Sequence, residues 1–141
     1  MDWILGRLAC GSLADATGLI EQRADGASGE IHDVLTLCEQ PTPALPGMTY
    51  GHHAPIPDEV WLPPDLWERR VESLRLLLVH GTVLVHCRLG VSRAPGLCAA
   101  YLIRCGMQPG EALAYVCAKR AVAQPHAETW RGIVEWARST V

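Results

Sequence analysis

A continuous apolar run in the second half of the chain constrains its fold more than any other feature. Residues 82–87 read TVLVHC, and apolar and polar side chains do not alternate along this run. A strand that is apolar on both sides is typical of a parallel sheet whose two faces are covered by helices. The run therefore predicts a buried strand at the centre of an α/β domain.

The neighbouring segments fit the same architecture. Residues 2–12 read as a strand and turn, and residues 30–40 as a second buried strand. Residues 64–80 place apolar side chains at helical spacing, with Pro64 in the first turn and Gly81 as the stop. Further helices are predicted over residues 13–22, with Ser12 as N-cap, and over 94–106, 109–120 and 127–139. This order predicts an α/β fold with a central, mostly parallel, twisted sheet flanked by helices.

Composition limits the function classes. The 141 residues are 49% hydrophobic and 19% charged with a net charge of -3, which predicts one globular domain over residues 1–141. This charge gives no indication of nucleic-acid binding, and no stretch approaches the roughly 20 apolar residues of a membrane span. The first apolar run is broken at Arg7, too early for a signal peptide. Six cysteines without a C-x-x-C pair predict a reducing, cytoplasmic location.

The loop after the central strand has the features of an oxyanion site. Residues 87–93, which we call the phosphate loop, join the carboxyl end of the strand to a helix N-terminus, where α/β sheets bind their ligands. Gly90 permits a backbone conformation that a side chain would obstruct, and Arg93 offers a planar fork for two phosphate oxygens. A cysteine at the base of this loop, Cys87, is favoured as the nucleophilic thiolate.

The motif H-C-x-x-G-x-S-R at residues 86–93 leads to a family resemblance. Residues 83–103, VLVHCRLGVSRAPGLCAAYLI, resemble the signature of the dual-specificity class of cysteine-based protein tyrosine phosphatases. LACGSLADA, VLTLCEQ and GMQPGEALAYVCAKR are similar to flanking segments of that family, so the resemblance covers nearly the whole chain. It implies a small, compact phosphatase that needs neither a metal nor another cofactor.

The resemblance also implies the roles of individual residues. Cys87 would be the nucleophile, His86 would orient the cysteine loop and support the thiolate, and Ser92 would donate a hydrogen bond to the sulfur. The phosphate would be bound by Arg88, Leu89, Gly90, Val91, Ser92 and Arg93. Ala94 stands where many relatives have serine or threonine, which removes one hydrogen-bonding side chain. Arg88 either adds charge at the rim of the pocket or points to solvent.

The leaving group needs a general acid. A helix over residues 64–80 runs about 25 Å, and the following strand returns about 17 Å, so a carboxylate just before the helix lies near the phosphate loop. Asp58 and Glu59 satisfy this condition, whereas the other candidates lie in the helix: Asp65, Glu68 and Glu72. Residues 52–58, HHAPIPD, which we call the acid loop, resemble the corresponding loop of the kinase-associated and phosphoinositide phosphatases. We therefore assign the acid to Asp58.

Two further residues have alternative interpretations. Cys38 ends the second buried strand and, if that strand lies beside the central one, comes within disulfide range of Cys87. The same two families place a redox-resolving cysteine at this position, although a buried apolar role is the alternative. His126 falls near the position where relatives have an asparagine or glutamine, so it either positions the hydrolytic water or starts the last helix.

These observations predict a metal-independent phosphomonoesterase with a phosphocysteine intermediate. The expected substrates are phosphotyrosine and also phosphoserine or phosphothreonine proteins, acted on by a monomer without nucleic-acid partners or membrane insertion. One alternative is a phosphatase-like module that binds phosphate groups without turnover. The others are a phosphatase acting on phosphoinositides or RNA 5′-phosphates and a rhodanese-like sulfurtransferase.

Overall fold

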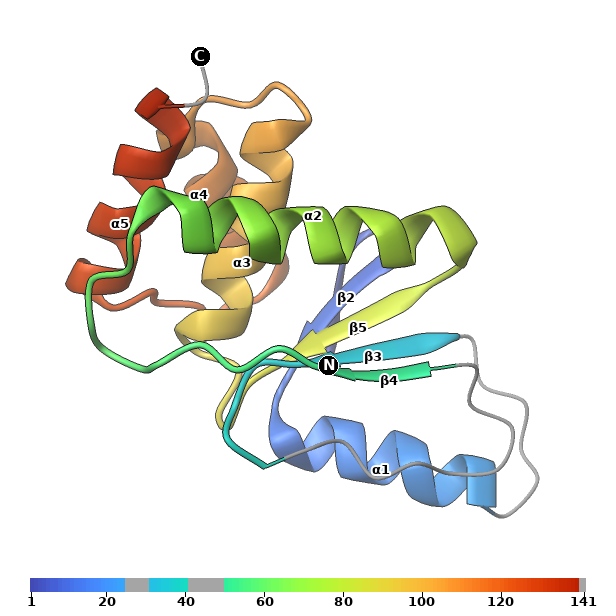
Figure 1. The fold of residues 1–141 in the computed structure, drawn as a ribbon. Helices are drawn as coiled ribbons and strands as arrows, with labels where there is room; N and C mark the ends of the chain where they lie inside the picture. The colour runs from blue at the N-terminus through green and yellow to red at the C-terminus, as the bar shows by residue number, and fades with distance from the viewer. Residues whose placement is uncertain (25–30, 41–49, 140–141) are drawn as a thin grey trace.

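The computed structural model describes residues 1–24, 31–40 and 50–139 and shows one sheet with helices on both faces (Figure 1). The five strands lie in the order β1-β2-β5-β3-β4. In chain order the elements are β1 Asp2–Leu5, β2 Leu8–Gly11, α1 Leu13–Ala24, β3 Asp33–Thr36, β4 Tyr50–His53, α2 Pro64–His80, β5 Val83–His86, α3 Arg93–Arg104, α4 Pro109–Lys119 and α5 Ala127–Ser139. The predicted α/β class and mostly parallel sheet are confirmed.

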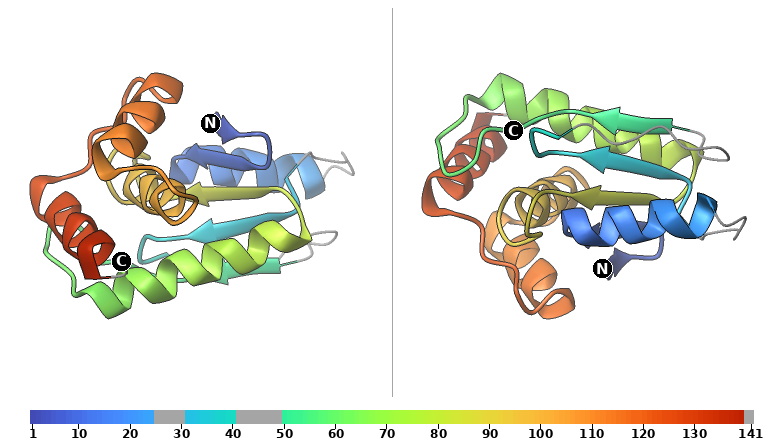
Figure 2. Two further views of the ribbon diagram at one scale, coloured as in Figure 1. Left: turned by 90° about the horizontal axis from the view of Figure 1, so that it is seen from above. Right: turned by 90° about the horizontal axis from the view of Figure 1, so that it is seen from below.

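Strand β5 occupies the centre of the sheet, as its apolar run predicts. It pairs parallel with β2 on one side and with β3 on the other, and all four of its side chains are buried. Leu84 packs in the smaller core cluster, under α1, while Val83 and Val85 belong to the larger cluster on the other face. Helices α2–α5 cover that second face, whereas α1 is the one described helix on the first (Figures 1 and 2).

The amino-terminal segment differs from the prediction of a single strand. A turn at Gly6 and Arg7 reverses the chain, so β1 pairs antiparallel with β2. The reversal leaves β2 as the parallel neighbour of β5 and places β1 at the edge of the sheet. The predicted cap of α1 is confirmed, because the Asp15 N–H donates to the Ser12 hydroxyl at 3.1 Å and the Ser12 N–H donates to the Asp15 carboxylate at 2.9 Å.

Strand β4 lies in the proline-rich segment of residues 41–64, which carries no sequence pattern of a strand or helix. Residues 41–49 lie outside the described part of the chain, but residues 50–53 pair parallel with β3, from Asp33 opposite Tyr50 to Thr36 opposite His53. This strand reads YGHH and carries no apolar pattern, since it lies at an edge of the sheet. Sequence periodicity therefore could not find it.

Helices α2–α5 form within two residues of their predicted bounds. Helix α2 buries Trp67, Val71, Leu74, Leu77 and Leu78 and packs against α3 and α5. None of the described helices is both long and apolar enough to cross a lipid bilayer. Because β3 and β5 are parallel, their carboxyl ends meet beside the start of α3, and this edge of the sheet holds the residues predicted to be functional.

The contact between α5 and α2 yields a prediction about stability. A Cβ on Gly132 of α5 would lie 2.8 Å from the Leu62 carbonyl oxygen and 2.9 Å from Trp67 Nε1, so Gly132→Ala must force the helices apart. We expect the free energy of unfolding, measured by denaturant titration, to fall by about 1–3 kcal/mol. The control is Gly18→Ala in α1, where a Cβ meets nothing within 4 Å, and we expect a gain of about 1 kcal/mol. Equal effects at the two positions would contradict this account.

Candidate active site

Outward-facing carbonyl groups shape the phosphate loop. Three of them accept hydrogen bonds from other parts of the chain: Arg88 O from the Leu13 N–H at 2.9 Å, Gly90 O from Arg120 Nε at 2.7 Å and Val91 O from the Gln124 N–H at 2.7 Å. The C=O and the next N–H of a trans peptide point in opposite directions, and the described residues contain no cis peptide bond. The amides of Leu89, Val91 and Ser92 therefore face away from these partners, on the side of the pocket.

Gly90 is required by both its conformation and its surroundings. Its φ of +69° lies in the left-handed region that side chains disfavour. A Cβ there would also lie 2.6 Å from the Gly11 carbonyl oxygen and 2.4 Å from Arg120 Nη2. The glycine predicted from the motif thus allows the loop to pack directly on β2 and on Arg120.

Cys87 forms the floor of a small pocket. Its side chain is buried, and its sulfur accepts a hydrogen bond from the Ala94 N–H in the first turn of α3 at 3.4 Å. The pocket has a volume of about 150 Å³ and is lined by Asp58, Glu59, Cys87, Arg88, Leu89, Val91, Ser92 and Arg93. The structure therefore brings the predicted nucleophile, acid and phosphate-binding arginine together around one cavity.

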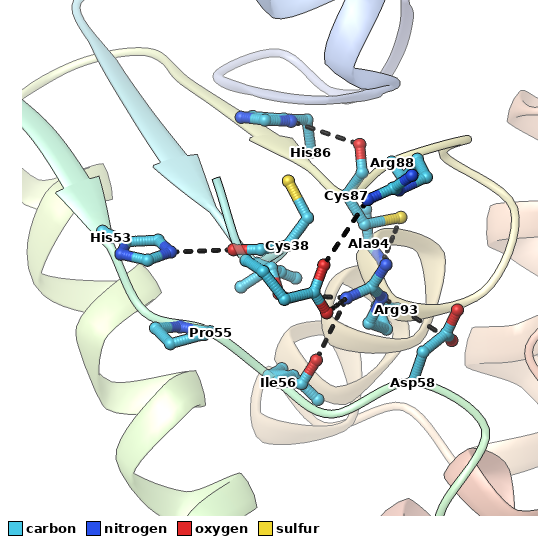
Figure 3. A network of polar contacts seen from close by, with 12 residues as sticks. Cys38, His53, Pro55, Ile56, Asp58, His86, Cys87, Arg88, Arg93 and Ala94 are labelled. Atoms are coloured by element: carbon cyan, nitrogen blue, oxygen red, sulfur yellow. Dashed lines mark hydrogen bonds and ion pairs between the residues drawn. The ribbon is translucent and has the colours of Figure 1, made fainter. Parts of the chain in front are cut away.

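Arg93 is held along one edge of its guanidinium group. Nη1 donates to the Ile56 carbonyl at 3.2 Å, to the Leu37 carbonyl at 3.4 Å and to the Glu39 carboxylate at 3.1 Å. Nε lies 3.6 Å from the Asp58 carboxylate, which lines the pocket (Figure 3). With Nη1 directed at the ends of β3 and the acid loop, the Nε–Nη2 edge is the one turned toward the pocket.

Backbone hydrogen bonds attach the acid loop to the sheet. The Ala54 N–H donates to Thr36 O and the Ile56 N–H donates to Leu37 O, both at 2.9 Å, which extends the pairing of β3 and β4. Arg70 of α2 adds a bond to the Pro55 carbonyl at 3.1 Å. These bonds set the path that delivers Asp58 to the pocket.

The turn of the chain after Asp58 helps to distinguish Asp58, Glu59 and Asp65 as candidates for the acid. Glu59 has a φ of +58°, an uncommon conformation for a residue with a side chain, and it follows Asp58 directly. Both residues line the pocket, but it is Asp58 that approaches Arg93. Asp65 instead lies in the first turn of α2 and pairs with Arg69 at 3.7 Å. The lengths of the helix and of the strand after it thus correctly predicted that Asp58 and Glu59 lie near the phosphate loop.

His86 orients the phosphate loop from the end of β5. Its Nδ1–H donates to the Cys87 carbonyl at 3.2 Å, and its Nε2 accepts from the Thr36 hydroxyl at 2.8 Å. Burial lowers the pKa of His86 below its ordinary value, which favours the neutral ring. The histidine therefore supports Cys87 through the position of the backbone, since both described contacts of its ring are to uncharged oxygens.

Ser92 and His126 lie side by side through a backbone contact. The His126 N–H donates to the Ser92 hydroxyl oxygen at 2.8 Å, so the hydroxyl proton remains for another acceptor, and the predicted one is the Cys87 sulfur. The His126 ring accepts from the Glu128 N–H at 3.2 Å, at the start of α5. This contact favours the helix-start role for the imidazole over the placement of water.

Cys38 lies near the site without lining the pocket, whereas Arg88 lies at its rim. Strands β3 and β5 are parallel neighbours as expected, but Leu37 follows the Thr36–His86 pair, so Cys38 is one residue beyond the level of Cys87. Both cysteines carry free, buried thiols, and a Cys38–Cys87 disulfide stays a prediction.

Arg88 is 58% exposed and lies 4.0 Å from Glu39, which places its charge at the rim.

Sequence reasoning missed Glu39 and Arg120. Glu39 follows Cys38 at the carboxyl end of β3, and this position beside the phosphate loop was a usable signal. Its pKa is lowered by a hydrogen bond from its own backbone N–H and by the nearby Arg93. Arg120 carried no such signal, because its contact with Gly90 depends on how α4 ends.

Comparison with known proteins connects this geometry to a family. Residues 75–139 match the model of the dual specificity phosphatase catalytic domain. Human dual specificity protein phosphatase 14 is 41% identical over 63 residues, which cover 42% of this chain and 30% of the relative. Residues 75–139 are thus similar to the catalytic domain of the dual specificity phosphatases, which are part of the cysteine-based protein tyrosine phosphatase superfamily.

Solved dual specificity phosphatases share the fold over the whole chain. The crystal structure of human DUSP28 has a TM-score of 0.84 at 24% identity and covers 99% of this chain and 97% of its own. A mouse putative dual specificity phosphatase, crystallised with zinc tungstate, has a TM-score of 0.82 at 25% identity over 98% of this chain and 86% of its own. The resemblance expected from the signature and flanking segments is confirmed.

Glu39 yields a prediction that separates its charge from its hydrogen bond. Glu39→Gln keeps an oxygen for Arg93 Nη1 but removes a negative charge beside the pocket, so we expect inorganic phosphate to bind roughly 3-fold more tightly at low salt. Glu39→Ala also removes the hydrogen-bond acceptor, so phosphate should bind more weakly than to Glu39→Gln. The measurement is isothermal titration calorimetry at two salt concentrations. Equal affinities for the two variants would show that the contact with Nη1 does not position Arg93.

Proposed function

We propose that this phosphatase hydrolyses phosphomonoesters through a phosphocysteine intermediate formed on Cys87. The observation that carries the proposal is the convergence of the Cys87 sulfur, Arg93 and Asp58 on one cavity of about 150 Å³. A phosphoryl group in that cavity would meet the inward amides of the phosphate loop and the Nε–Nη2 edge of Arg93. These donors match the charge that the equatorial oxygens carry in the transition state.

In the first step the Cys87 thiolate attacks phosphorus and the bond to the leaving oxygen breaks. The electron pair of that bond goes to the alkoxide or phenolate, and Asp58 supplies the proton that neutralises it. Helix α3 favours the thiolate, because its N-terminus is directed at the sulfur through the Ala94 N–H. The products of this step are a free hydroxyl compound and phosphocysteine.

In the second step water attacks the phosphocysteine and gives a proton to the Asp58 carboxylate. The bond between phosphorus and sulfur breaks, and inorganic phosphate and the thiolate are formed. The hydroxyl of Ser92, with its oxygen bonded to the His126 N–H, can direct its proton to the sulfur and stabilise the leaving thiolate. All charges in both steps are thus matched by groups of the chain itself.

Phosphoproteins are the substrate class that the rim of the pocket supports. Asp58 and Glu59 line the cavity and Glu39 lies beside it, while Arg88 is the exposed cation among the described residues that line the pocket. Three carboxylates repel polyanions such as phosphoinositides and RNA more than singly phosphorylated side chains. The curated relatives are named protein phosphatases, which supports phosphotyrosine together with phosphoserine or phosphothreonine.

The cysteines support a reducing, cytoplasmic site of action. All six thiols are free, and four of them, Cys10, Cys38, Cys87 and Cys98, are buried. Free thiols persist where glutathione and thioredoxin keep proteins reduced. A single chain carries every residue invoked in the two steps, which supports action as a monomer.

The nucleophile is tested by Cys87→Ser. We expect turnover of phosphotyrosine peptides to fall below a few per cent, because serine lacks the low-energy anion that attacks phosphorus. Binding of tungstate should persist, since the amides and Arg93 remain. A phosphate-binding module without turnover would instead show no hydrolysis by the wild-type chain. Rates in chelator should equal rates without it, and rescue of a lost rate by a divalent ion would refute the metal-independent mechanism.

The acid is tested by Asp58→Asn against Glu59→Gln. For phosphoserine peptides, whose leaving alkoxide needs a proton, Asp58→Asn should lower kcat by roughly 10²–10⁴-fold. For an activated aryl phosphate the loss should shrink, because its leaving group needs little protonation. Glu59→Gln should retain most of the rate with both substrates. If Glu59→Gln showed the larger loss and the larger dependence on leaving group, Glu59 would be the acid.

A further inference from the structure

A buried arginine forms the back of the phosphate loop, on the side opposite the pocket. Arg120 follows the last turn of α4, and only 8% of its side chain is exposed. Nε donates to the Gly90 carbonyl at 2.7 Å, and Nη1 donates to the Asp2 carboxylate at 2.7 Å. The guanidinium thus joins the catalytic loop to the first residue of β1.

The absence of a side chain on Gly90 allows this contact. A Cβ there would lie 2.4 Å from Arg120 Nη2, so only a glycine lets the guanidinium come this close to the backbone of residue 90. With its carbonyl bound to Nε, the Gly90–Val91 peptide must turn the Val91 N–H toward the pocket. The position of Arg120 therefore sets the direction of one of the amides that would bind phosphate.

Asp2 supplies the charge that makes the position of Arg120 stable. A buried guanidinium is unfavourable without a charged partner, and its planar donors hold a fixed geometry once two acceptors are bound. Asp2 lies opposite Cys10 of β2, so its backbone is set by the sheet. The carboxylate itself is 42% exposed, which leaves room for its replacement by asparagine.

We propose that Asp2 and Arg120 are positioning residues that act on oxyanion binding through the Gly90–Val91 peptide. The inference rests on the proposed function only in taking phosphate as the anion that the loop binds. The inference predicts that loss of the Asp2 charge weakens anion binding, whereas electrostatics alone would predict tighter binding. Removing the negative charge of Asp2 would favour an anion in the pocket, whereas releasing Arg120 from its position would misdirect the Val91 N–H and weaken binding.

The experiment measures tungstate binding, a probe that requires no turnover. Isothermal titration calorimetry would compare the wild-type chain with Asp2→Asn and Arg120→Lys, and kcat/KM for p-nitrophenyl phosphate would be measured in parallel. We expect Asp2→Asn to weaken tungstate binding and lower kcat/KM by roughly 10-fold, the effect of one charge-assisted hydrogen bond. Arg120→Lys should lose roughly 10–100-fold, because an ammonium group cannot hold both acceptors in the planar arrangement.

The matched control is Glu72→Gln in α2. This variant removes a carboxylate from an ion pair with Arg75, at 2.6 Å, on a helix that does not line the pocket. Tungstate affinity and kcat/KM should stay within about 2-fold of wild type. Melting temperatures would be recorded for all variants, so that binding is compared only among folded chains.

The outcomes separate the inference from the proposed function. A lower melting temperature of Asp2→Asn with unchanged or tighter tungstate binding would overturn the inference, since Asp2 would then act through stability or charge alone. If Arg120→Lys does not fold, the comparison of Asp2→Asn with wild type tests the inference by itself. If wild type binds tungstate but hydrolyses nothing, while Asp2→Asn binds tungstate more weakly, the inference stands and the proposed function fails. If wild type hydrolyses the substrate and Asp2→Asn has the same tungstate affinity and the same kcat/KM, the proposed function stands and the inference fails.

Discussion

The direction of the carbonyl groups in the phosphate loop is the constraint on which the rest of the site depends. A loop of seven residues cannot present its amides to an anion unless the opposite ends of the peptides are satisfied elsewhere. The chain meets this need with donors from four places: His86, the start of α1, the end of α4 and the segment before α5. Elements far apart in the sequence thus contribute to one small cavity. The helices on both faces of the sheet are therefore needed for the site as well as for the hydrophobic core.

Arg93 connects this loop with the acid. Its buried guanidinium binds the carbonyl groups of Leu37 and Ile56, so the end of β3, the acid loop and α3 meet at one side chain. The same group that is expected to bind phosphate also determines where the acid loop lies. Binding and proton transfer are therefore not independent properties of this site, and substitutions at the end of β3 should be read with both in mind.

The sequence allowed prediction of the features that depend on local pattern. The apolar run of β5 and the spaced side chains of α2 are short-range signals, and Cys87, Gly90 and Arg93 lie within one motif. The lengths of a helix and a strand restricted the acid to Asp58 or Glu59, a geometric argument that needs no contact to be known, and the resemblance of the acid loop then selected Asp58. Strand β4 was missed because an edge strand needs no apolar side chains, and the hairpin of β1 and β2 because Gly6 and Arg7 resemble any surface turn. The link between Asp2 and Arg120 arises from tertiary structure, which no pattern along the chain records, whereas the place of Glu39 at the carboxyl end of β3 was a signal that the prediction did not use.

The attachment of the acid loop has a consequence for the kinetics of ligand exchange. Asp58 lies two residues after Ile56, and the segment before it is tied to β3 by the N–H groups of Ala54 and Ile56 and to Arg93 by the Ile56 carbonyl. This attachment holds the carboxylate predicted to be the acid at the pocket, 3.6 Å from Arg93 Nε. Association with an oxyanion then proceeds without a slow closing step, so its rate is governed by diffusion and by the electric field at the mouth of the pocket. In such a site the ionic strength of the medium, and not the opening of a lid, sets how quickly phosphate enters and leaves.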